Sequence, residues 1–199
     1  MLKNVTAFAL LGALTGSCVS AEQPKEIKDA PVQEDVVSIP VEPYIPSWKC
    51  PDCTPEEQYV LGELQEHTRI TDRNALATIM GNIKQESMFT ANICEGGARV
   101  PYEQCFSGGY GLIQWTTANR YRGLGNFCEK YGCNPSTTEG ELRYMFNEYQ
   151  WTRSEPVFKT PGKTIEWYTQ HGAYPWLGWG IHGARTDYAY DYARMLVES

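Results

Sequence analysis

Two stretches of the sequence decide the fold: GNIKQES at residues 81–87 and GYGLIQWT at residues 109–116. The first follows apolar residues spaced by three and four, namely Leu76, Ile79, Met80 and Ile83. This spacing predicts a core-facing helix from about residue 71 to residue 88. Glu86 falls on the shoulder of the apolar stripe, and Gln85 falls on the outer face of the helix.

A glutamate at this place suits acid catalysis. Burial beside apolar groups disfavours the carboxylate and raises its pKa. A carboxyl group that stays protonated near neutral pH can protonate a leaving oxygen. Helical spacing alone favours the other interpretation, in which Glu86 is a helix-end acid paired with an arginine.

Together the two stretches resemble the lysozyme-like superfamily, in which Glu-Ser at the end of a central helix faces a Gly-Leu-x-Gln strand across a sugar cleft. The resemblance is closer to the phage tail lysozyme domain family. Its pattern is Gly-Asn-x-x-x-Glu-Ser, then Gly-Tyr-Gly-x-x-Gln-Trp, then a helix containing Arg. Asn119-Arg120 follows here, and the resemblance covers about residues 70–150, with a loose match at residues 187–189. It implies a muramidase that cleaves the bond between N-acetylmuramic acid and N-acetylglucosamine in peptidoglycan.

Carried over residue by residue, the resemblance implies that Glu86 is the catalytic acid. We expect substrate contacts from five further residues, namely Ser87, Tyr110, Gln114, Trp115 and Arg120. Two alternatives stay open. Gln114 could instead tie the glycine-rich stretch to the helices, and Trp115 fits the core as well as the cleft.

The second catalytic group is not evident from the sequence. Most glycosidases use two carboxylates, and Glu95 and Glu103 lie in the stretch where a second one could sit. The alternative for each is a solvated loop charge. A lytic transglycosylase would need only the substrate's own group, but the Ala-Tyr-Asn-x-Gly motif of such enzymes is absent, so hydrolysis is favoured.

The remaining patterns predict a mainly helical α+β domain with a small β-hairpin insert after the helix that carries Glu86, and the resemblance implies that this fold is lysozyme-like. The insert occupies residues 89–115, which are rich in glycine. Further helices are expected at about residues 54–67, 118–131, 138–149, a short one after residue 161, and 184–197.

Local signals mark several of these helix ends. Thr54 and Glu57 form a capping box around Pro55, and Ser136 with Glu139 forms another. Gly132 predicts the end of the helix that starts near residue 118.

Seven cysteines indicate an oxidising compartment. If Cys18 is removed or lipidated, proximity favours Cys50–Cys53, Cys94–Cys105 and Cys128–Cys133 out of fifteen pairings. A zinc site is disfavoured because the three histidines are scattered and only one C-x-x-C is present. We expect neither a metal nor an organic cofactor.

The first part of the chain predicts export. Residues 1–21 resemble a secretory signal peptide, and LTGSC at residues 14–18 resembles a lipobox with Cys18 as a lipidated N-terminus. Residues 22–47 are acidic and hold five prolines, which predicts a disordered tether before a domain at 48–199. The protein is then periplasmic or extracellular, with or without a lipid anchor; association with a virion is the alternative.

Composition limits the partners. The formal charge is −7 and no basic block is present, which argues against nucleic acid. We expect a monomer that acts on peptidoglycan and meets a membrane only through its N-terminal signal or anchor. The aromatic residues 174–180 could line a sugar site, although packing is favoured. Rival functions are a peptidoglycan-binding module that does not cut and a structural part of a phage particle.

Overall fold

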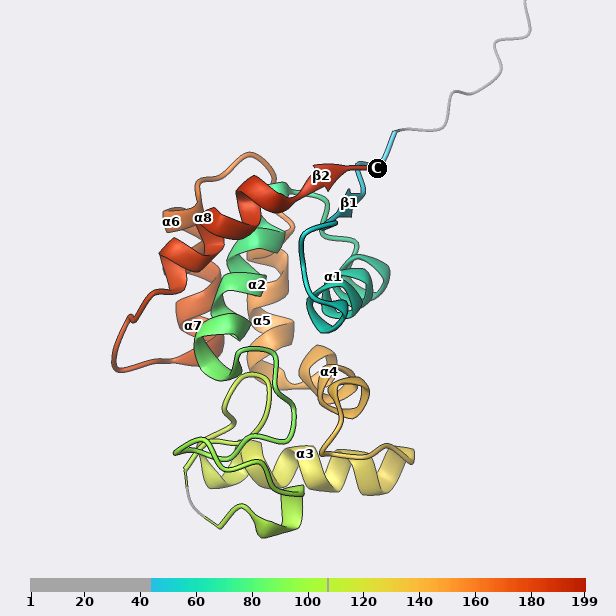
Figure 1. Cartoon of the computed structure of the whole chain (residues 1–199), viewed down its shortest axis with the longest axis vertical. Coiled ribbons are helices and arrows are strands. Elements are labelled where there is room, and N and C mark those ends of the chain that lie inside the picture. Colours follow the sequence, from blue (N-terminus) through green and yellow to red (C-terminus); the bar gives the residue numbers. More distant parts are fainter. Residues whose placement is uncertain (1–43, 107) are drawn as a thin grey trace, which may run out of the picture. The chain divides into compact units, whose positions relative to one another are not determined.

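The computed structural model describes residues 44–106 and 108–199. The predictions for residues 1–43 lie outside the described residues. The domain is mainly helical, with one small antiparallel sheet and one π-helical turn (Figure 1). In chain order its elements are β1 (Trp48–Lys49), α1 (Pro55–Thr68), α2 (Arg73–Ser87), the 3-10 helix η1 (Tyr102–Gln104), α3 (Ala118–Tyr131), α4 (Thr138–Asn147), α5 (Tyr149–Phe158), α6 (Ile165–Tyr168), the π-helix η2 (Thr169–Ala173), α7 (Tyr174–Leu177), α8 (Arg185–Met195) and β2 (Val197–Glu198).

Helix α2 is the centre of the domain, and it packs most extensively against α8 (Figure 1). Nine consecutive residues of α2, 75–83, are buried. Gly81 makes the close approach of α8 feasible, because a Cβ atom there would lie 2.5 Å from the backbone nitrogen of Ala189. The core helix that the apolar spacing predicts is therefore confirmed, and it is buried over more of its surface than one stripe.

Several helix ends follow the predicted local chemistry. The Thr54 hydroxyl and the Glu57 carboxylate form the expected capping box at the start of α1. Gly132, with φ of 67°, ends α3. The prediction for α4 is wrong by one residue, because Thr137 is its N-cap. The Ser136 hydroxyl instead accepts a hydrogen bond from the Tyr102 backbone N–H at 2.8 Å.

The helix predicted at about 138–149 ends at Asn147, and the sequence did not predict the next helix, α5. The backbone of Glu148 is extended, with φ −74° and ψ 151°, and this residue ends α4 and precedes α5. Its N–H still bonds to the carbonyl oxygen of Tyr144 at 2.9 Å. The break turns the chain so that the side chain of Glu148 is buried, a role described below.

The insert after α2 is present but contains little β-structure. Its pairing consists of two isolated bridges, Ile93 with Arg99 and Cys94 with Tyr110. Residues 111–114 form successive turns, so the strand expected there is wrong. The two-stranded sheet lies elsewhere, where β1 pairs with β2 and brings Trp48 opposite Glu198.

Three disulfides brace the loops. They join Cys50 to Cys53, Cys94 to Cys105 and Cys128 to Cys133. These are the pairs that proximity favours. The second closes the insert, and the third fastens the end of α3.

Candidate active site

Glu86 lies one residue before the end of α2 and is partly buried, with 16% of its side chain exposed. Met88 caps the end of the helix, and its left-handed backbone (φ 51°) is followed by a second left-handed residue, Phe89 (φ 60°). Two such residues in succession turn the chain sharply into the insert. The carboxyl group of Glu86 thus lies where the core helix meets the insert.

The partner of Glu86 is Arg185, the first residue of α8. Its Nη2 donates to Oε1 of Glu86 at 2.5 Å, and its side chain is only 5% exposed. Nη1 of Arg185 lies 3.4 Å from Oδ1 of the buried Asn82. The guanidinium carbon also lies 4.4 Å from the ring centre of Trp179, a cation–π contact. Helical spacing alone favours the alternative of a helix-end acid paired with an arginine, and the structure contains this pair.

Opposing effects act on the pKa of Glu86. Burial is the largest and raises it, whereas the charge and hydrogen bond of Arg185 and the charge of Arg120 lower it. The net result is a raised pKa, so burial outweighs the two arginines. Arg185 therefore fixes the carboxyl group of Glu86 in position, and the proton affinity of this group is higher than that of an exposed glutamate.

The residue before Glu86 positions its arginine partner. Oε1 of Gln85 accepts a hydrogen bond at 2.7 Å from the backbone N–H of Ala184, directly before α8. Gly183, with φ of 63°, leaves the space that the Gln85 side chain fills. Gln85 was predicted on the outer face, and this is wrong because the loop before α8 covers it.

Ser87 joins α2 to the turn at residues 111–114. Its hydroxyl is buried and bonds to the carbonyl oxygen of Leu112 at 2.9 Å and to that of Ile83 at 3.3 Å. The sugar contact expected of Ser87 does not agree with this burial. Its hydrogen bond holds the turn at residues 111–114 against the end of α2.

Gln114 has a left-handed backbone, with φ of 52°. Its Nε2 donates to the carbonyl oxygens of Gly111 at 3.0 Å and Ile93 at 3.3 Å. A Cβ atom on Gly109 would lie 2.8 Å from the Gln114 side chain. These contacts match the alternative in which Gln114 ties the insert together, and they leave its side chain half-buried.

Tyr110 and Trp115 lie in the core, because both side chains are fully buried. The Tyr110 hydroxyl donates to the carbonyl oxygen of Val100 at 3.0 Å, and burial raises its pKa to about 12. Trp115 donates from Nε1 to Oε2 of Glu148 at 3.2 Å. This burial does not agree with the substrate contact expected of Tyr110, and for Trp115 it matches the alternative of a core position.

Arg120 forms a two-point ion pair with the buried Glu148. Its Nε lies 3.0 Å from Oε2 and its Nη2 lies 2.6 Å from Oε1. Trp176 adds a fourth donor to this carboxylate, at 3.4 Å from Oε1. Arg120, expected to bind substrate, is thus committed to a pair that joins α3 to the α4–α5 junction, and only its charge acts on Glu86.

A second buried carboxyl group lies under the turn. Oε2 of Glu141 accepts from the backbone N–H of Leu112 at 2.7 Å, and Oε1 has no partner among the described residues. Burial raises the pKa of Glu141 well above its usual range. A Cβ atom on Gly111 would overlap this carboxyl group, so glycine is required there.

The two candidates for a second catalytic carboxylate are both exposed on the insert. Oε2 of Glu95 accepts from the backbone N–H of Gly109 at 3.0 Å, so its position is fixed beside the turn. No described contact fixes Glu103, which lies in η1.

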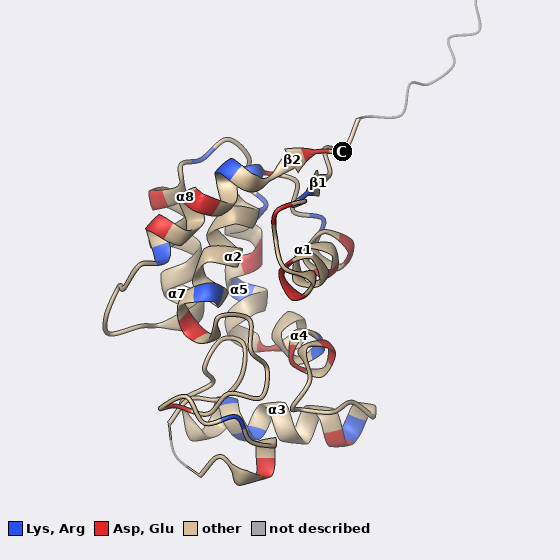
Figure 2. Ribbon diagram, viewed as in Figure 1, with Lys and Arg blue, Asp and Glu red and all other residues tan. Residues whose placement is uncertain are grey.

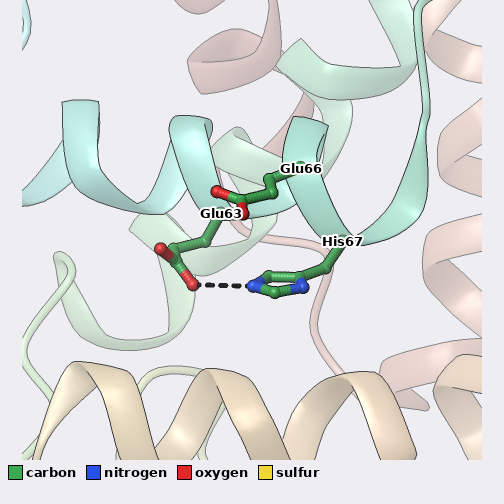
Figure 3. A group of neighbouring side chains, drawn as sticks. All are labelled: Glu63, Glu66 and His67. Carbon is green, nitrogen blue, oxygen red and sulfur yellow. Dashed lines mark ion pairs between the residues drawn. The ribbon is translucent and has the colours of Figure 1, made fainter.

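Three residues on α1 come close enough to bind a metal ion. The ligand atoms of Glu63, Glu66 and His67 lie within 4.8 Å of one another on one helix (Figure 3). Nε2 of His67 is 3.2 Å from Oε2 of Glu63, and its ring lies 5.5 Å from that of Phe146. Spacing by three and four makes such pairs ordinary on a helix surface, and we assign no metal role to them.

A family model described as phage tail lysozyme matches residues 57–175. The chain belongs to the phage tail lysozyme family. Lysozymes of this kind are glycosidases, and the family implies peptidoglycan as the substrate. No curated protein matches the chain.

The matched segment of this lysozyme includes Glu86 and the turn at residues 111–114, but ends before Trp179 and Arg185. The residues that sequence reasoning missed are Gln85, Asn82, Glu141, Glu148 and Arg185. For Arg185 one signal existed, because the helix that carries it was predicted and loosely matched the family pattern.

Membership in the family and the three disulfides are compatible with an exported or virion-associated lysozyme. Within residues 44–106 and 108–199, no helix has the length and apolarity to cross a membrane. Lysine and arginine are dispersed among acidic residues over the helices of Figure 2. This distribution offers no support for a nucleic-acid surface in the part of the chain shown.

Proposed function

We propose that this enzyme hydrolyses the bond between N-acetylmuramic acid and N-acetylglucosamine, with Glu86 as the general acid. The observation that carries the proposal is the state of Glu86: its pKa is raised by burial, while Arg185 fixes one of its two oxygens. A general acid benefits from both properties, a proton affinity above that of an exposed carboxyl group and a fixed direction.

The two oxygens of Glu86 have different roles in this proposal. Oε1 accepts from Arg185, whereas Oε2 has no hydrogen-bond partner among the described residues. Oε2 is therefore the atom that carries the proton and delivers it to the glycosidic oxygen. As the bond breaks, positive charge develops on the sugar and negative charge on Glu86. Arg185 then stabilises the carboxylate that results.

A water molecule completes the hydrolysis, and a carboxylate on the insert is the candidate that activates it. Glu95 is favoured over Glu103 because its carboxylate is fixed by Gly109. Replacing each by glutamine, with the intact chain otherwise unchanged, tests the assignment. Loss of activity in Glu95→Gln and retention in Glu103→Gln is expected, and equal activity in all three proteins would contradict it.

Lytic transglycosylation on the same bond is the second candidate. The charges that act on Glu86 belong to two arginines, Arg185 and Arg120, and not to a second carboxylate. Transglycosylation fits this site because the reaction needs only one carboxyl group. Glu86 would then act first as acid and later as base, accepting a proton from the sugar hydroxyl that closes the anhydro ring. The products differ from those of hydrolysis by one water.

The decisive experiment digests purified peptidoglycan and analyses the released muropeptides by mass spectrometry. We expect reducing ends from the wild-type protein and no release from Glu86→Gln, with an unchanged circular dichroism spectrum. Glu139→Gln is a matched control, because this exposed glutamate pairs only with Arg143 on the same helix. Retained activity in Glu86→Gln would refute the proposed acid. Wall binding without release by the wild type would favour the non-cutting module, and anhydro products would favour transglycosylation.

We also propose export of the chain through residues 1–21, with residues 22–47 as a tether and either plain cleavage or lipidation at Cys18. The disulfides of the described domain support an oxidising destination. The mass of the mature N-terminal peptide tests this, because a chain that begins at an acyl-bearing Cys18 is heavier than one that begins at residue 22 by the lipid and by residues 18–21. An uncleaved N-terminus would contradict both routes.

A further inference from the structure

A cavity of about 300 Å³ lies beside Arg185, at the junction of η2 and α8. It is lined by Glu166, Thr169, Gln170, Tyr174, Trp179, His182 and Thr186. Ligand sites in proteins begin at about this size. The last three of these residues follow the segment that the family model matches, so the family does not assign this cavity.

The cavity has the chemistry of a sugar site. Trp179 and Tyr174 supply aromatic surface, and their ring centres are 5.2 Å apart. Gln170, His182 and Thr186 supply polar groups, and Nε2 of His182 lies 2.8 Å from the Thr186 hydroxyl. Aromatic faces with hydrogen-bonding groups match a sugar ring, which has apolar C–H faces and a rim of hydroxyl groups.

One polar group in the cavity lining lacks a partner. Thr169 is only 5% exposed, and its hydroxyl makes no hydrogen bond with the described residues. An unpaired buried hydroxyl is costly, so a ligand that bonds to it gains correspondingly. Thr169 is also the first residue of the π-helical turn, and such turns occur frequently at functional sites.

The charged residue of the lining does not change this assignment. Glu166 accepts a hydrogen bond from the Tyr190 hydroxyl, and its side chain is exposed. Its carboxylate is therefore solvated and already accepts a hydrogen bond. The buried part of the cavity is uncharged, which favours a neutral sugar over the ammonium group of a stem peptide.

The position of the cavity links it to Glu86. Trp179 contacts the guanidinium of Arg185 at 4.4 Å, and the same guanidinium binds Glu86 at 2.5 Å. We propose that this cavity binds one N-acetylhexosamine ring of the glycan strand, next to the ring whose bond is cleaved. The inference rests on the proposed function, because it takes the glycan strand to be the substrate. Its test measures sugar binding and does not require activity.

The test measures binding of the N-acetylglucosamine trimer to the full-length protein in the Glu86→Gln background, by calorimetry. Thr169→Val removes the hydroxyl and keeps the shape, and we expect the Kd to rise about 3- to 10-fold, the range of one hydrogen bond. Gln170→Ala, at an exposed position of the lining, should also weaken binding. The melting temperature of Thr169→Val should stay equal or rise, because no described hydrogen bond is lost.

Ser154→Ala is the matched control. Ser154 lies on α5, outside the cavity lining, and its hydroxyl is likewise buried without a described partner. Its removal should leave the Kd unchanged. Unchanged trimer binding in both Thr169→Val and Gln170→Ala would overturn the sugar site. Binding of a lysine-containing stem peptide that is lost in Glu166→Gln, without trimer binding, would overturn it in favour of a peptide. Loss of activity in Glu86→Gln is a separate measurement, so either proposal can fail alone.

Discussion

Gly81 and Ala189 bring the backbones of α2 and α8 into contact, so closely that a Cβ atom on Gly81 would lie 2.5 Å from the backbone nitrogen of Ala189 and 2.9 Å from the carbonyl oxygen of Arg185. The neighbours are backbone atoms, which cannot rotate away. The separation of the two helices therefore sets the distance between Glu86 and Arg185.

Gly81→Ala should consequently push α8 away from α2. We expect a loss of about 1–3 kcal/mol in the free energy of unfolding, as for other overpacked cores, and a loss of lysozyme activity that exceeds the unfolded fraction. Gly62→Ala on α1 is the control, since no atom lies within 4 Å of its added Cβ. That variant should gain roughly 0.5–1 kcal/mol from helix propensity. Full activity in a stable Gly81→Ala protein would contradict the link between helix spacing and the site.

Replacing Arg185 should move the pH profile of activity. Arg185 lowers the pKa of Glu86 against the larger effect of burial, so Arg185→Gln raises that pKa further. The protonated form then persists to higher pH, and the alkaline limb of kcat/KM shifts upward. Because the carboxyl group also loses its fixed direction, kcat should fall by roughly 100-fold.

Arg185→Lys keeps the charge and should leave the alkaline limb near its wild-type position. Arg194→Gln serves as a control, because this arginine is exposed and pairs with Asp191 on the same helix. Activity on suspended peptidoglycan, followed by turbidity across pH, measures both effects. A limb that stays in place or moves to lower pH in Arg185→Gln would contradict the assignment of Glu86.

Glu141 should make the domain less stable as pH rises. Its pKa is raised by burial in the folded state, whereas an unfolded glutamate titrates near about 4.3. Above that unfolded pKa the folded state binds the extra proton, so stability falls with pH at up to about 1.4 kcal/mol per unit until the folded pKa is passed. Below the unfolded pKa, Glu141 is protonated in both states and does not reduce the stability.

Glu141→Gln should flatten this dependence and keep the acceptor for the Leu112 N–H. Denaturant unfolding between pH 4 and pH 9, compared with wild type, provides the measurement. The Glu86 carboxyl contributes a dependence of the same sign, so the Glu86→Gln protein is measured alongside. An unchanged slope in Glu141→Gln would show that Glu141 is ionised in the fold.

The pair of Arg120 and Glu148 should be the most costly one to break. Both side chains are mostly buried, and Trp115 and Trp176 also donate to this carboxylate. Glu148→Gln leaves a buried guanidinium without its counter-charge, and a loss of about 3–5 kcal/mol is expected. Thermal unfolding measures it, with Glu139→Gln expected within roughly 0.5 kcal/mol of wild type because its pair is exposed. A similar small loss in both variants would contradict the buried charge pair.

The sequence predicts those parts of the fold that depend on neighbours in the chain. Thr54 and Gly132 mark helix ends because capping involves groups within a few residues. The break at Glu148 has no such signal. An extended residue between two helical segments is stabilised there by Arg120 on another helix, and this partner is known only once the helices are packed.

The same reason limits prediction of the site. Glu86 is identified by its place on an amphipathic helix and by the paired motifs, but Arg185 is 99 residues away. The family resemblance placed Tyr110 at the cleft, and it left Trp115 open between the cleft and the core. Both are buried, since aromatic rings suit a core as well as a sugar and periodicity in a turn-rich insert does not distinguish the two.

The three disulfides have a consequence for assembly of the active site. Each joins cysteines that are near neighbours in the chain, and none encloses another or involves a residue after Cys133. A chain that emerges with its N-terminus first can close all three bridges before α8 exists. The three disulfides can therefore form before Arg185 is in place. Their formation does not show that the active site is complete. If Glu86 is the general acid as proposed, the active site is complete only once α8 docks on α2 and brings Arg185 to Glu86.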